Sequence, residues 1–372
     1  MINTYVPFLG REEKKNINNC FRTNFFSTAG PLIQKFENSF SKTYKFRNSV
    51  ALNSGTSSLH LGLKALGVKK GDLVIVPSYT FAATVNAIIY CEAEPWFFDI
   101  NEQFEIDLTL LDKEIKNNTI RSKKIIKHRL TRQTVRAIIP VSSFGKKIDF
   151  NKYLSFAKKN KMKVLYDVAA SHDPNIFNFT KDINMHFCFS FNGNKTLTAG
   201  SGGVFSSNST LIAKKVKMLA NVGKSISNYD YVDVGYNYRM SNIQAAIALA
   251  QLKKIKNILR IKKRLFQNYR EKLKLSKKTK MSEVSNYTNW VFFLILENKK
   301  KFLNLKKKFN KNGIQLNYFW KPLHCQKPYK SYLKTKMFCS LKFWDKIAIL
   351  PSHPGIKEIQ QRKIIKLINE FK

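Results

Sequence analysis

Between residues 49 and 191, short β-rich runs alternate with segments of helical spacing, and this alternation constrains the fold more than any other feature of the sequence. The runs that read as strands are residues 49–52, 73–76, 96–100, 137–141, 164–167 and 187–191. Amphipathic segments lie between most of them. Such alternation is typical of a mostly parallel sheet flanked by helices, whose ligands bind where strands lead into helices. The sequence therefore predicts an α/β fold.

The length of 372 residues predicts two domains, because chains beyond ~250–300 residues usually divide. At residues 251–275 the pattern becomes one long basic helix, with apolar positions at Leu252, Ile255, Leu259, Phe266, Tyr269 and Leu273. We expect a large domain over residues 1–250, including an N-terminal arm, and a small α/β domain over residues 251–372. The small domain should contain a strand at 290–296, helices at 300–310 and 356–371, and a break at Gly313.

A basic insertion, residues 116–134, interrupts this order. Its central run, residues 121–132, is rich in Lys and Arg and contains one His. We interpret it as a solvated surface segment. The alternative is a site for an anionic partner.

The formal net charge of +42 is an excess that raises nucleic acid or an anionic membrane as a partner. However, the basic residues are spread along the chain without a zinc-finger, helix-turn-helix or RNA-recognition signature. We therefore interpret the lysines as residues at solvated surface positions and expect no nucleic-acid partner. The positive charge should still attract anionic substrates. The competing hypothesis predicts retention on DNA that weakens steeply with salt.

The cysteines and the apolar runs indicate a reduced cytoplasmic protein. Cys20, Cys91, Cys188, Cys325 and Cys339 are odd in number and lack C-x-x-C spacing, so we expect no disulfide framework and no metal site. The N-terminus lacks a secretory signal pattern, and apolar runs such as 291–296 are far shorter than the ~18 residues that span a bilayer. We therefore expect no membrane partner.

Residues 53–58, Asn-Ser-Gly-Thr-Ser-Ser, follow the first strand and open a helical segment at 59–66. Gly55 allows close approach of the backbone, and the amides at a helix N-terminus favour phosphate. This turn is a candidate anion site. The alternative is a serine that only caps the helix.

Asp167 ends the apolar run at 164–167, where a half-buried carboxylate needs a partner. A protonated pyridine nitrogen is a suitable one, because the charge pair keeps the ring a strong electron sink. The alternative is an aspartate that caps the following turn.

Lys195 follows the run at 187–191 in a turn rich in Gly, Asn and Ser, and Gly200, Gly202 and Gly203 come soon after it. These glycines permit close approach of the backbone to a flat cofactor. A lysine in a partly desolvated pocket has a lowered pKa and forms a Schiff base with an aldehyde.

Together these motifs resemble the DegT/StrS-type sugar aminotransferases, which are fold type I pyridoxal-phosphate enzymes. The resemblance covers nearly the whole chain in the family's order. It rests on FFSTAGPLIQKFE, SGTSSLHLGLKALG, VIVPSYTFAATVNAI, SFNGNKTLTAGSGG, VGYNYRMSNIQAAIALAQL and YFWKPLHCQKPY.

The resemblance implies a role for each matching residue. Lys195 would carry pyridoxal 5'-phosphate as a Schiff base, Asp167 would pair with the pyridine nitrogen, Phe81 would stack on the ring, and Gly55, Thr56 and Ser190 would hold the phosphate. Asn237 would reach the same phosphate from the partner subunit, so a homodimer with shared active sites is expected. Arg239 and His324 would line the sugar-nucleotide cleft, although His324 also fits a structural hydrogen-bonding role.

The reaction that the resemblance implies is a transamination in cell-surface polysaccharide biosynthesis. An amino group would pass from L-glutamate, through the pyridoxamine form, to the keto group of a nucleotide-linked sugar, while Lys195 shuttles the proton. Related dehydratases carry His at the lysine position, so Lys195 argues against dehydration. The alternative is a non-catalytic sugar-nucleotide-binding or regulatory member of the same fold.

Three departures from the family pattern concern the substrate more than the cofactor. Ala170 stands where Glu, Gln, His or Pro is usual, and Ser142 stands where His is common. The insertion at residues 116–134 is longer than the usual link.

Overall fold

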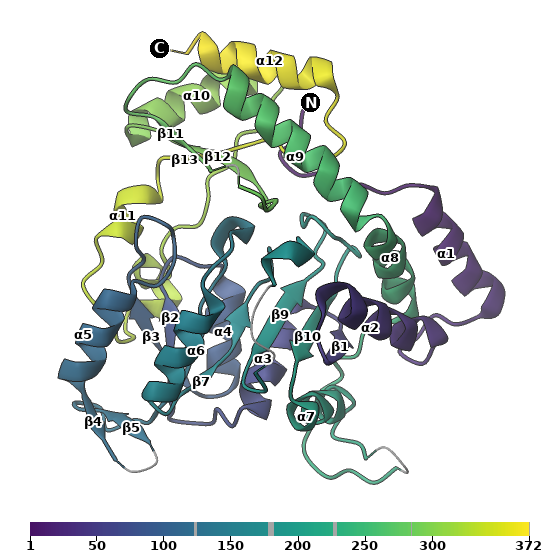
Figure 1. Ribbon diagram of the computed structural model, residues 1–372, viewed down its shortest axis with the longest axis vertical. Helices are drawn as coiled ribbons and strands as arrows, with labels where there is room; N and C mark the ends of the chain where they lie inside the picture. The colour runs from purple at the N-terminus through teal and green to yellow at the C-terminus, as the bar shows by residue number, and fades with distance from the viewer. Residues whose placement is uncertain (123–124, 178–181, 226–228, 284, 372) are drawn as a thin grey trace.

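A computed structural model describes residues 1–371 except 123–124, 178–181, 226–228 and 284 (Figure 1). Its centre is a twisted sheet built from two connected halves. The strands are β1 (Asn48–Leu52), β2 (Leu73–Pro77), β3 (Glu94–Phe98), β6 (Val135–Ile138), β7 (Lys163–Val164), β8 (Tyr166–Asp167), β9 (His186–Ser190) and β10 (Gly203–Ser207). One half has the order β3-β2-β6-β7 and the other β1-β10-β9-β8.

The two halves join at Leu165, which separates β7 from β8. The Leu165 amide donates to the Ile138 carbonyl at 3.0 Å, and the Asp167 amide donates to the Pro140 carbonyl at 3.0 Å. Pairing is parallel throughout except that β10 runs antiparallel to β1 and β9. The mostly parallel α/β fold expected from the sequence is confirmed.

The six strand runs expected from the sequence all fall on strands, and the ends differ most at two of them. β3 begins at Glu94 and β6 at Val135, so the runs placed at 96–100 and 137–141 were set too far along the chain. β10 was missed because Gly203 begins it and Ser206 and Ser207 end it, a composition that reads as a loop.

Helices cover both faces of the sheet and give three layers. The first face carries α2 (Pro31–Tyr44), α5 (Leu108–Asn118), α6 (Phe150–Lys159) and α8 (Asn242–Lys253), and the second carries α3 (Gly55–Ala65), α4 (Ala82–Tyr90) and α7 (Thr210–Ala220). α1 (Arg11–Thr23) packs against α8. Because both faces are buried, the strands are apolar without alternation.

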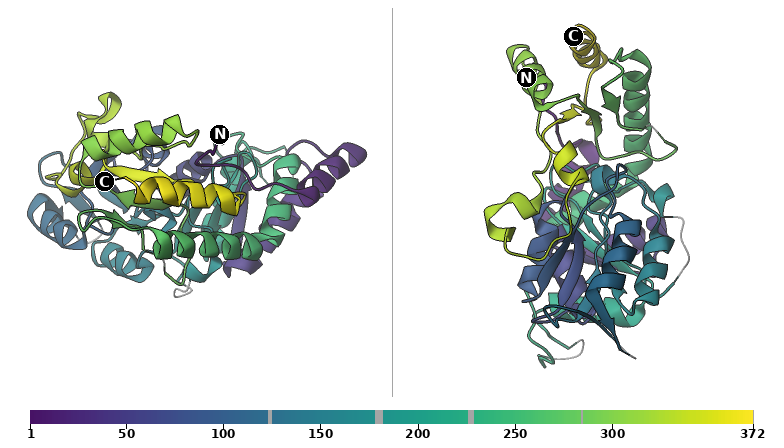
Figure 2. Two further views of the ribbon diagram at one scale, coloured as in Figure 1. Left: turned by 90° about the horizontal axis from the view of Figure 1, so that it is seen from above. Right: turned by 90° about the vertical axis from the view of Figure 1, so that its left-hand side faces the viewer.

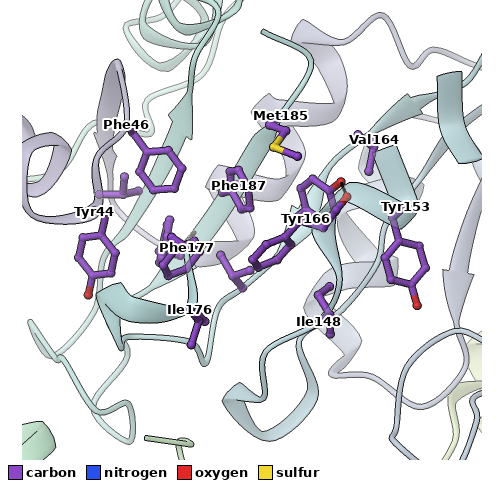
Figure 3. Close-up of a cluster of buried hydrophobic side chains, with 14 of the residues drawn as sticks. Tyr44, Phe46, Ile148, Tyr153, Val164, Tyr166, Ile176, Phe177, Met185 and Phe187 are labelled. Atoms are coloured by element: carbon purple, nitrogen blue, oxygen red, sulfur yellow. Dashed lines mark hydrogen bonds between the residues drawn. The ribbon is translucent and has the colours of Figure 1, made fainter. Parts of the chain in front are cut away.

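Aromatic side chains fill the first of these two cores, behind the strand that carries Asp167. Figure 3 shows Phe46, Phe177, Phe187 and Tyr166 packed together. The rings of Tyr166 and Phe187 stack with centroids 4.8 Å apart, and the Tyr166 hydroxyl donates to the Phe150 carbonyl at 2.5 Å. Because the Tyr166 hydroxyl is hydrogen bonded, its burial leaves no unsatisfied polar group, and the aromatic packing stabilises the position of β8.

The C-terminal part has its own antiparallel sheet, in the order β11-β12-β13. Its elements are α9 (Ile255–Lys272), β11 (Lys280–Met281), β12 (Phe292–Ile295), α10 (Lys299–Lys311), α11 (Cys339–Phe343), β13 (Ile347–Leu350) and α12 (Glu358–Asn369). Three of its helices, α9, α10 and α12, lie side by side across the top of the molecule (Figure 2). Ile2 joins this core, and its amide donates to the Gly313 carbonyl at 2.7 Å.

The long helix expected at residues 251–275 is two helices. α8 ends at Lys253 and α9 begins at Ile255, with Lys254 between them at φ −99° and ψ 6°. Unbroken helical periodicity across the junction hid this break. Leu259 packs in the core of the large sheet and Phe266 in the C-terminal core, so α9 contributes to both. The domain boundary at residue 250 stays a prediction.

The basic insertion forms a short hairpin of β4 (Thr119–Arg121) and β5 (Ile126–His128) after α5, at the end of the molecule away from α12 (Figure 1). Residues 123–124 of the insertion lie outside the described residues. Ile126 is buried, and the His128 ring lies edge-on to Trp96 with centroids 4.9 Å apart. The hairpin is thus anchored by its apolar face, in agreement with a surface segment.

Among the described residues, no helix is both long enough and apolar enough to cross a membrane.

Candidate active site

A cavity of about 270 Å³ opens at the carboxyl ends of the central strands. Six of the residues predicted from the sequence line it: Gly55, Thr56, Phe81, Asp167, Ser190 and Lys195. Trp290 and Trp320, from the C-terminal part, complete its wall. The structure therefore brings together side chains that are widely separated in the sequence.

The turn between β1 and α3 closes one end of the cavity. Ser54 caps the helix, since its side chain accepts a 3.0 Å hydrogen bond from the Ser57 amide. Gly55 begins the helix so close to β9 that a Cβ there would lie 2.7 Å from the Ser190 Cβ. Ser54 therefore caps the helix. Gly55 and Thr56, in the first turn of the helix, line the cavity together with Ser190, and these three residues form a candidate anion site, which we call the cradle.

Asp167 is buried at the end of β8. The Thr84 hydroxyl donates to its Oδ2 at 2.7 Å, and the Ala169 amide donates to its Oδ1 at 3.0 Å. Burial raises the pKa of this carboxyl, while these two hydrogen bonds and the Lys195 charge oppose the increase. The hydrogen bond from Ala169 is the turn cap considered from the sequence, and Asp167 lines the cavity together with Thr84 as well.

Lys195 follows β9, and its side chain is partly buried at the cavity wall. Burial lowers the pKa of its amine to about 8, while the negative charge of Asp167 acts in the opposite direction. The Nζ atom lies over the ring of Trp290, 4.0 Å from the centroid. An amine with this pKa is largely protonated at neutral pH yet has a substantial uncharged fraction.

Phe81 is the residue before α4, and its ring is 58% exposed at the rim of the cavity. The nearest aromatic neighbour recorded for it is Trp320, with centroids 6.2 Å apart. An open aromatic face at this position is available to stack on a flat ligand.

Three predicted residues lie outside the cavity lining. Asn237 has an exposed side chain, and its carbonyl accepts a 3.3 Å hydrogen bond from the Asn53 amide group. Arg239 is half-buried, and within the described residues its Nε finds no partner. The His324 Nδ1 lies 2.5 Å from the Ser78 hydroxyl, which fits the structural role considered for it, and burial lowers its pKa.

Two of the three departures from the family pattern, Ser142 and Ala170, line the cavity. Ser142 is hydrogen bonded to the Ser171 hydroxyl at 2.6 Å and to the Lys146 carbonyl. Ala170 offers only a methyl group. Both positions therefore leave room that longer side chains would occupy.

Among the lining residues that were not predicted from the sequence, Thr84 contacts Asp167 and Trp290 contacts Lys195. Thr84 follows Phe81 by three residues, so it lies one helical turn along the same face of α4. That spacing was a usable signal. Trp290 sits just before β12, in a run that reads only as a strand, and no local pattern indicates its place beside Lys195.

Comparison with known proteins identifies the family. The sequence pattern of the DegT/DnrJ/EryC1/StrS aminotransferase family matches residues 7–369. The chain belongs to this family. GDP-perosamine synthase of Vibrio cholerae is 30% identical over 383 residues, which cover 100% of this chain and 99% of that protein.

Solved structures agree with this family membership. A DegT/DnrJ/EryC1/StrS aminotransferase from Brucella abortus superposes with a TM-score of 0.85 at 26% identity, covering 97% of this chain and 95% of that one. The pyridoxal-phosphate form of Spr1654 from Streptococcus pneumoniae superposes with a TM-score of 0.85 at 22% identity, covering 98% and 97%, and supports the fold. The cofactor of this family, and of this protein, is pyridoxal 5'-phosphate.

The residues of the cavity fit that cofactor. The cradle at Gly55 has no room for a Cβ, as a site for a tightly held phosphate requires. At the other end Asp167 offers a buried carboxylate, and Lys195 offers an amine with a lowered pKa. Within the described part of the chain, no group of three His, Cys, Asp or Glu side chains is arranged to hold a metal ion.

Proposed function

We propose that this protein is a sugar aminotransferase that moves an amino group from L-glutamate to the keto group of a nucleotide-linked sugar, with Lys195 as its catalytic residue. One observation carries the proposal: a partly buried amine with a pKa of about 8 and a buried carboxylate, Lys195 and Asp167, line the same cavity. The likeness to GDP-perosamine synthase supports a sugar nucleotide as the acceptor.

The binding roles follow from the position of each group. The amides of Gly55 and Thr56, at the N-terminus of α3, and the hydroxyl of Ser190 bind the cofactor phosphate. Phe81 stacks on the ring with its open face. The strongly positive chain also attracts the anionic nucleotide.

When bound, pyridoxal phosphate supplies an electron sink that stabilises negative charge at the carbon next to the migrating nitrogen. Asp167 pairs with the ring nitrogen and keeps it protonated, and Thr84 helps to keep Asp167 ionised for this purpose. Lys195, once its amine is free, takes a proton at Nζ from the donor carbon and delivers a proton to the sugar carbon in the second half-reaction.

A second subunit completes the site in this proposal. Asn237 binds the phosphate of the partner's cofactor, and Arg239 lies near the sugar-nucleotide cleft. The stretch around Asn237 also exposes Tyr231, Val232 and Val234, and exposed apolar side chains of this kind mark contact surfaces. We assign His324 to the same cleft through the segment that contains Trp320.

Absorbance spectroscopy tests the role of Lys195. Purified protein loaded with pyridoxal phosphate should show an absorbance band near the visible edge that borohydride abolishes. A peptide map of the reduced protein should then show the phosphopyridoxyl group on Lys195. Lys195→Ala should lack the band, whereas Lys42→Ala, which removes an exposed lysine on α2, should retain it. A colourless protein that takes up no cofactor contradicts the proposal.

A half-reaction screen identifies the substrates. The protein in its pyridoxamine form is offered a panel of nucleotide-linked keto sugars, and recovery of the original band reports the acceptor. Conversion of the pyridoxal form by L-glutamate, but not by other amino acids, reports the donor. If only free keto acids restore the band, the sugar assignment is wrong while the cofactor assignment stands.

A further inference from the structure

The side chain of Trp290 lies directly against the amine of Lys195, although the two residues belong to different parts of the fold. The Nζ atom of Lys195 is over the indole face, 4.0 Å from the ring centroid. The indole nitrogen in turn donates a 2.7 Å hydrogen bond to the carbonyl of Asn194, the residue before the lysine. Trp290 thus contacts both the amine and the backbone of the Lys195 segment.

The backbone of Trp290 is held on both sides. Its amide donates to the Phe144 carbonyl at 2.8 Å, and its carbonyl accepts a 2.8 Å hydrogen bond from the Nζ atom of Lys262. Lys262 is buried and also donates to the Ser352 carbonyl at 3.0 Å. Among the described residues, the hydrogen-bond acceptors of this amine are these two carbonyls, and burying an amine without a charged partner costs free energy.

The N-terminal arm supports the indole ring. Tyr5 stacks on Trp290 with centroids 5.5 Å apart and an interplanar angle of 18°. Gly145 leaves space for Trp290, because a Cβ at this glycine would lie 3.1 Å from the Trp290 Cβ and 2.7 Å from its amide nitrogen. Contacts from four separate segments therefore fix one orientation of the indole.

We propose that Trp290 is a positioning residue for Lys195, whose indole face holds the free lysine amine in its protonated form next to the reacting carbon. The proposal rests on the assignment of Lys195 made above. A cation over an indole face is attracted by the ring quadrupole, and the attraction is strongest where water is excluded. The amine released in each half-reaction carries the proton that it has taken up, and the indole keeps that proton within reach of the site.

Two roles for the indole predict opposite changes in the lysine. If the indole only excluded water, its loss would hydrate the amine and raise the pKa of Lys195. If stabilisation of the cation by the indole face outweighs this exclusion of water, replacement of the indole by a smaller non-aromatic side chain will lower that pKa. The direction of the change therefore separates the two.

Titration of Lys195 in the cofactor-free protein measures this directly. Trace acetylation over a range of pH, followed by digestion with a protease that does not cut at lysine and mass spectrometry of the Lys195 peptide, gives the apparent pKa. Trp290→Leu should lower it by roughly half a unit to one unit. Trp290→Phe, which keeps an aromatic face, should retain most of the native value.

Trp320→Leu is the matched control, because Trp320 lines the same cavity while Lys195 contacts Trp290. It should leave the Lys195 pKa unchanged. An unchanged or raised pKa in Trp290→Leu overturns the proposal, and an equal decrease in Trp320→Leu does so as well.

Fluorinated tryptophan keeps the test decisive if Trp290→Leu does not fold. Site-specific replacement of Trp290 by indoles with increasing fluorine content weakens the quadrupole without changing the shape. The Lys195 pKa should fall stepwise across this series, and a constant value overturns the proposal. Because no cofactor is present, these results are independent of the borohydride experiment, so failure of the Lys195 assignment and failure of the Trp290 role are distinguishable.

Discussion

Thr84 donates a 2.7 Å hydrogen bond to the carboxylate of Asp167. Thr84 lies in the first turn of α4, whereas Asp167 ends β8. The hydroxyl of Thr84 also lies 3.0 Å from that of Thr80. This hydrogen bond lowers the pKa of a carboxyl that burial raises. In the proposed function, where Asp167 pairs with the cofactor nitrogen, Thr84 thus helps to keep the carboxylate negatively charged.

Thr84→Val should move the acid limb of the pH–rate profile upward. The isosteric methyl group removes the hydrogen bond to the charged form, so the pKa of Asp167 rises further and the carboxylate is neutralised at a higher pH. The shift in kcat/KM should be about one unit. Profiles of the native protein and Thr84→Val measure it.

Thr84→Ser is the control, because it retains the hydroxyl and should keep the native profile. Identical profiles for Thr84→Val and the native protein would show that the hydrogen bond does not influence the ionisation of Asp167.

Lys262 should make the free energy of unfolding depend on pH. Burial lowers its pKa from 10.5 to about 7 in the folded protein. Between these two values the unfolded chain binds more protons, so the contribution of Lys262 to stability rises with pH across this window and is lost as pH falls towards 7. The expected slope is about 1.4 kcal/mol for each pH unit.

Urea unfolding of the native protein and of Lys262→Met over this pH window measures the effect. The difference between their unfolding free energies should grow with pH in favour of the native protein, while the contribution of Lys195, present in both proteins, cancels. A constant difference would contradict the pKa of about 7.

Local sequence patterns were sufficient to predict two residues that line the cavity. Asp167 was predicted because a carboxylate ends an apolar run, and Lys195 because its turn combines small residues with later glycines. The same local reasoning failed for Trp290, whose neighbour Lys195 lies in another segment of the fold. Periodicity reports which face of an element is buried and not which distant element covers it.

Long-range packing also explains the errors in the elements. β10 is a strand because β1 and β9 pair with it on both sides, which offsets the weak strand preference of Gly203 and the serines. No glycine or proline marks the break at Lys254, so no local signal in the sequence predicts it.

Gly55→Ala should weaken cofactor binding through a steric effect. The new Cβ would lie 2.7 Å from the Ser190 Cβ, and both atoms sit on rigid backbone. Overpacking of this kind costs about 1–3 kcal/mol, and here we expect most of this cost to appear as a loss of cofactor-binding free energy. Fluorescence titration of the cofactor-free protein with pyridoxal phosphate measures the loss of affinity.

Gly193→Ala provides a matched control on the lysine loop. The contact recorded for a Cβ there is 3.9 Å from the Gly200 carbonyl oxygen, which is ordinary packing. Its affinity for the cofactor should stay close to that of the native protein. Equal losses in both variants would indicate general loop disturbance and not closure of the cradle.

Subunit complementation tests whether Asn237 serves the partner's site. If each site takes Lys195 from one subunit and Asn237 from the other, a hybrid dimer of Lys195→Ala and Asn237→Ala chains contains one site without either change and one site with both. Each variant alone should be nearly inactive. After unfolding and refolding of an equal mixture, activity should recover to about a quarter of the native value, because about half of the dimers are hybrids.

The same experiment also tests the alternative, in which Asn237 acts in the active site of its own chain. If Asn237 acted within its own chain, every hybrid site would carry one defect and mixing would restore nothing. Mixing Lys195→Ala with Asp167→Asn is the control, because both residues line the same cavity of one chain and no intact site can form. Recovery of activity only in the mixture with Asn237→Ala would therefore show that Asn237 acts in the active site of the partner subunit. Its side chain, which is exposed in its own chain, would then contact the partner's site.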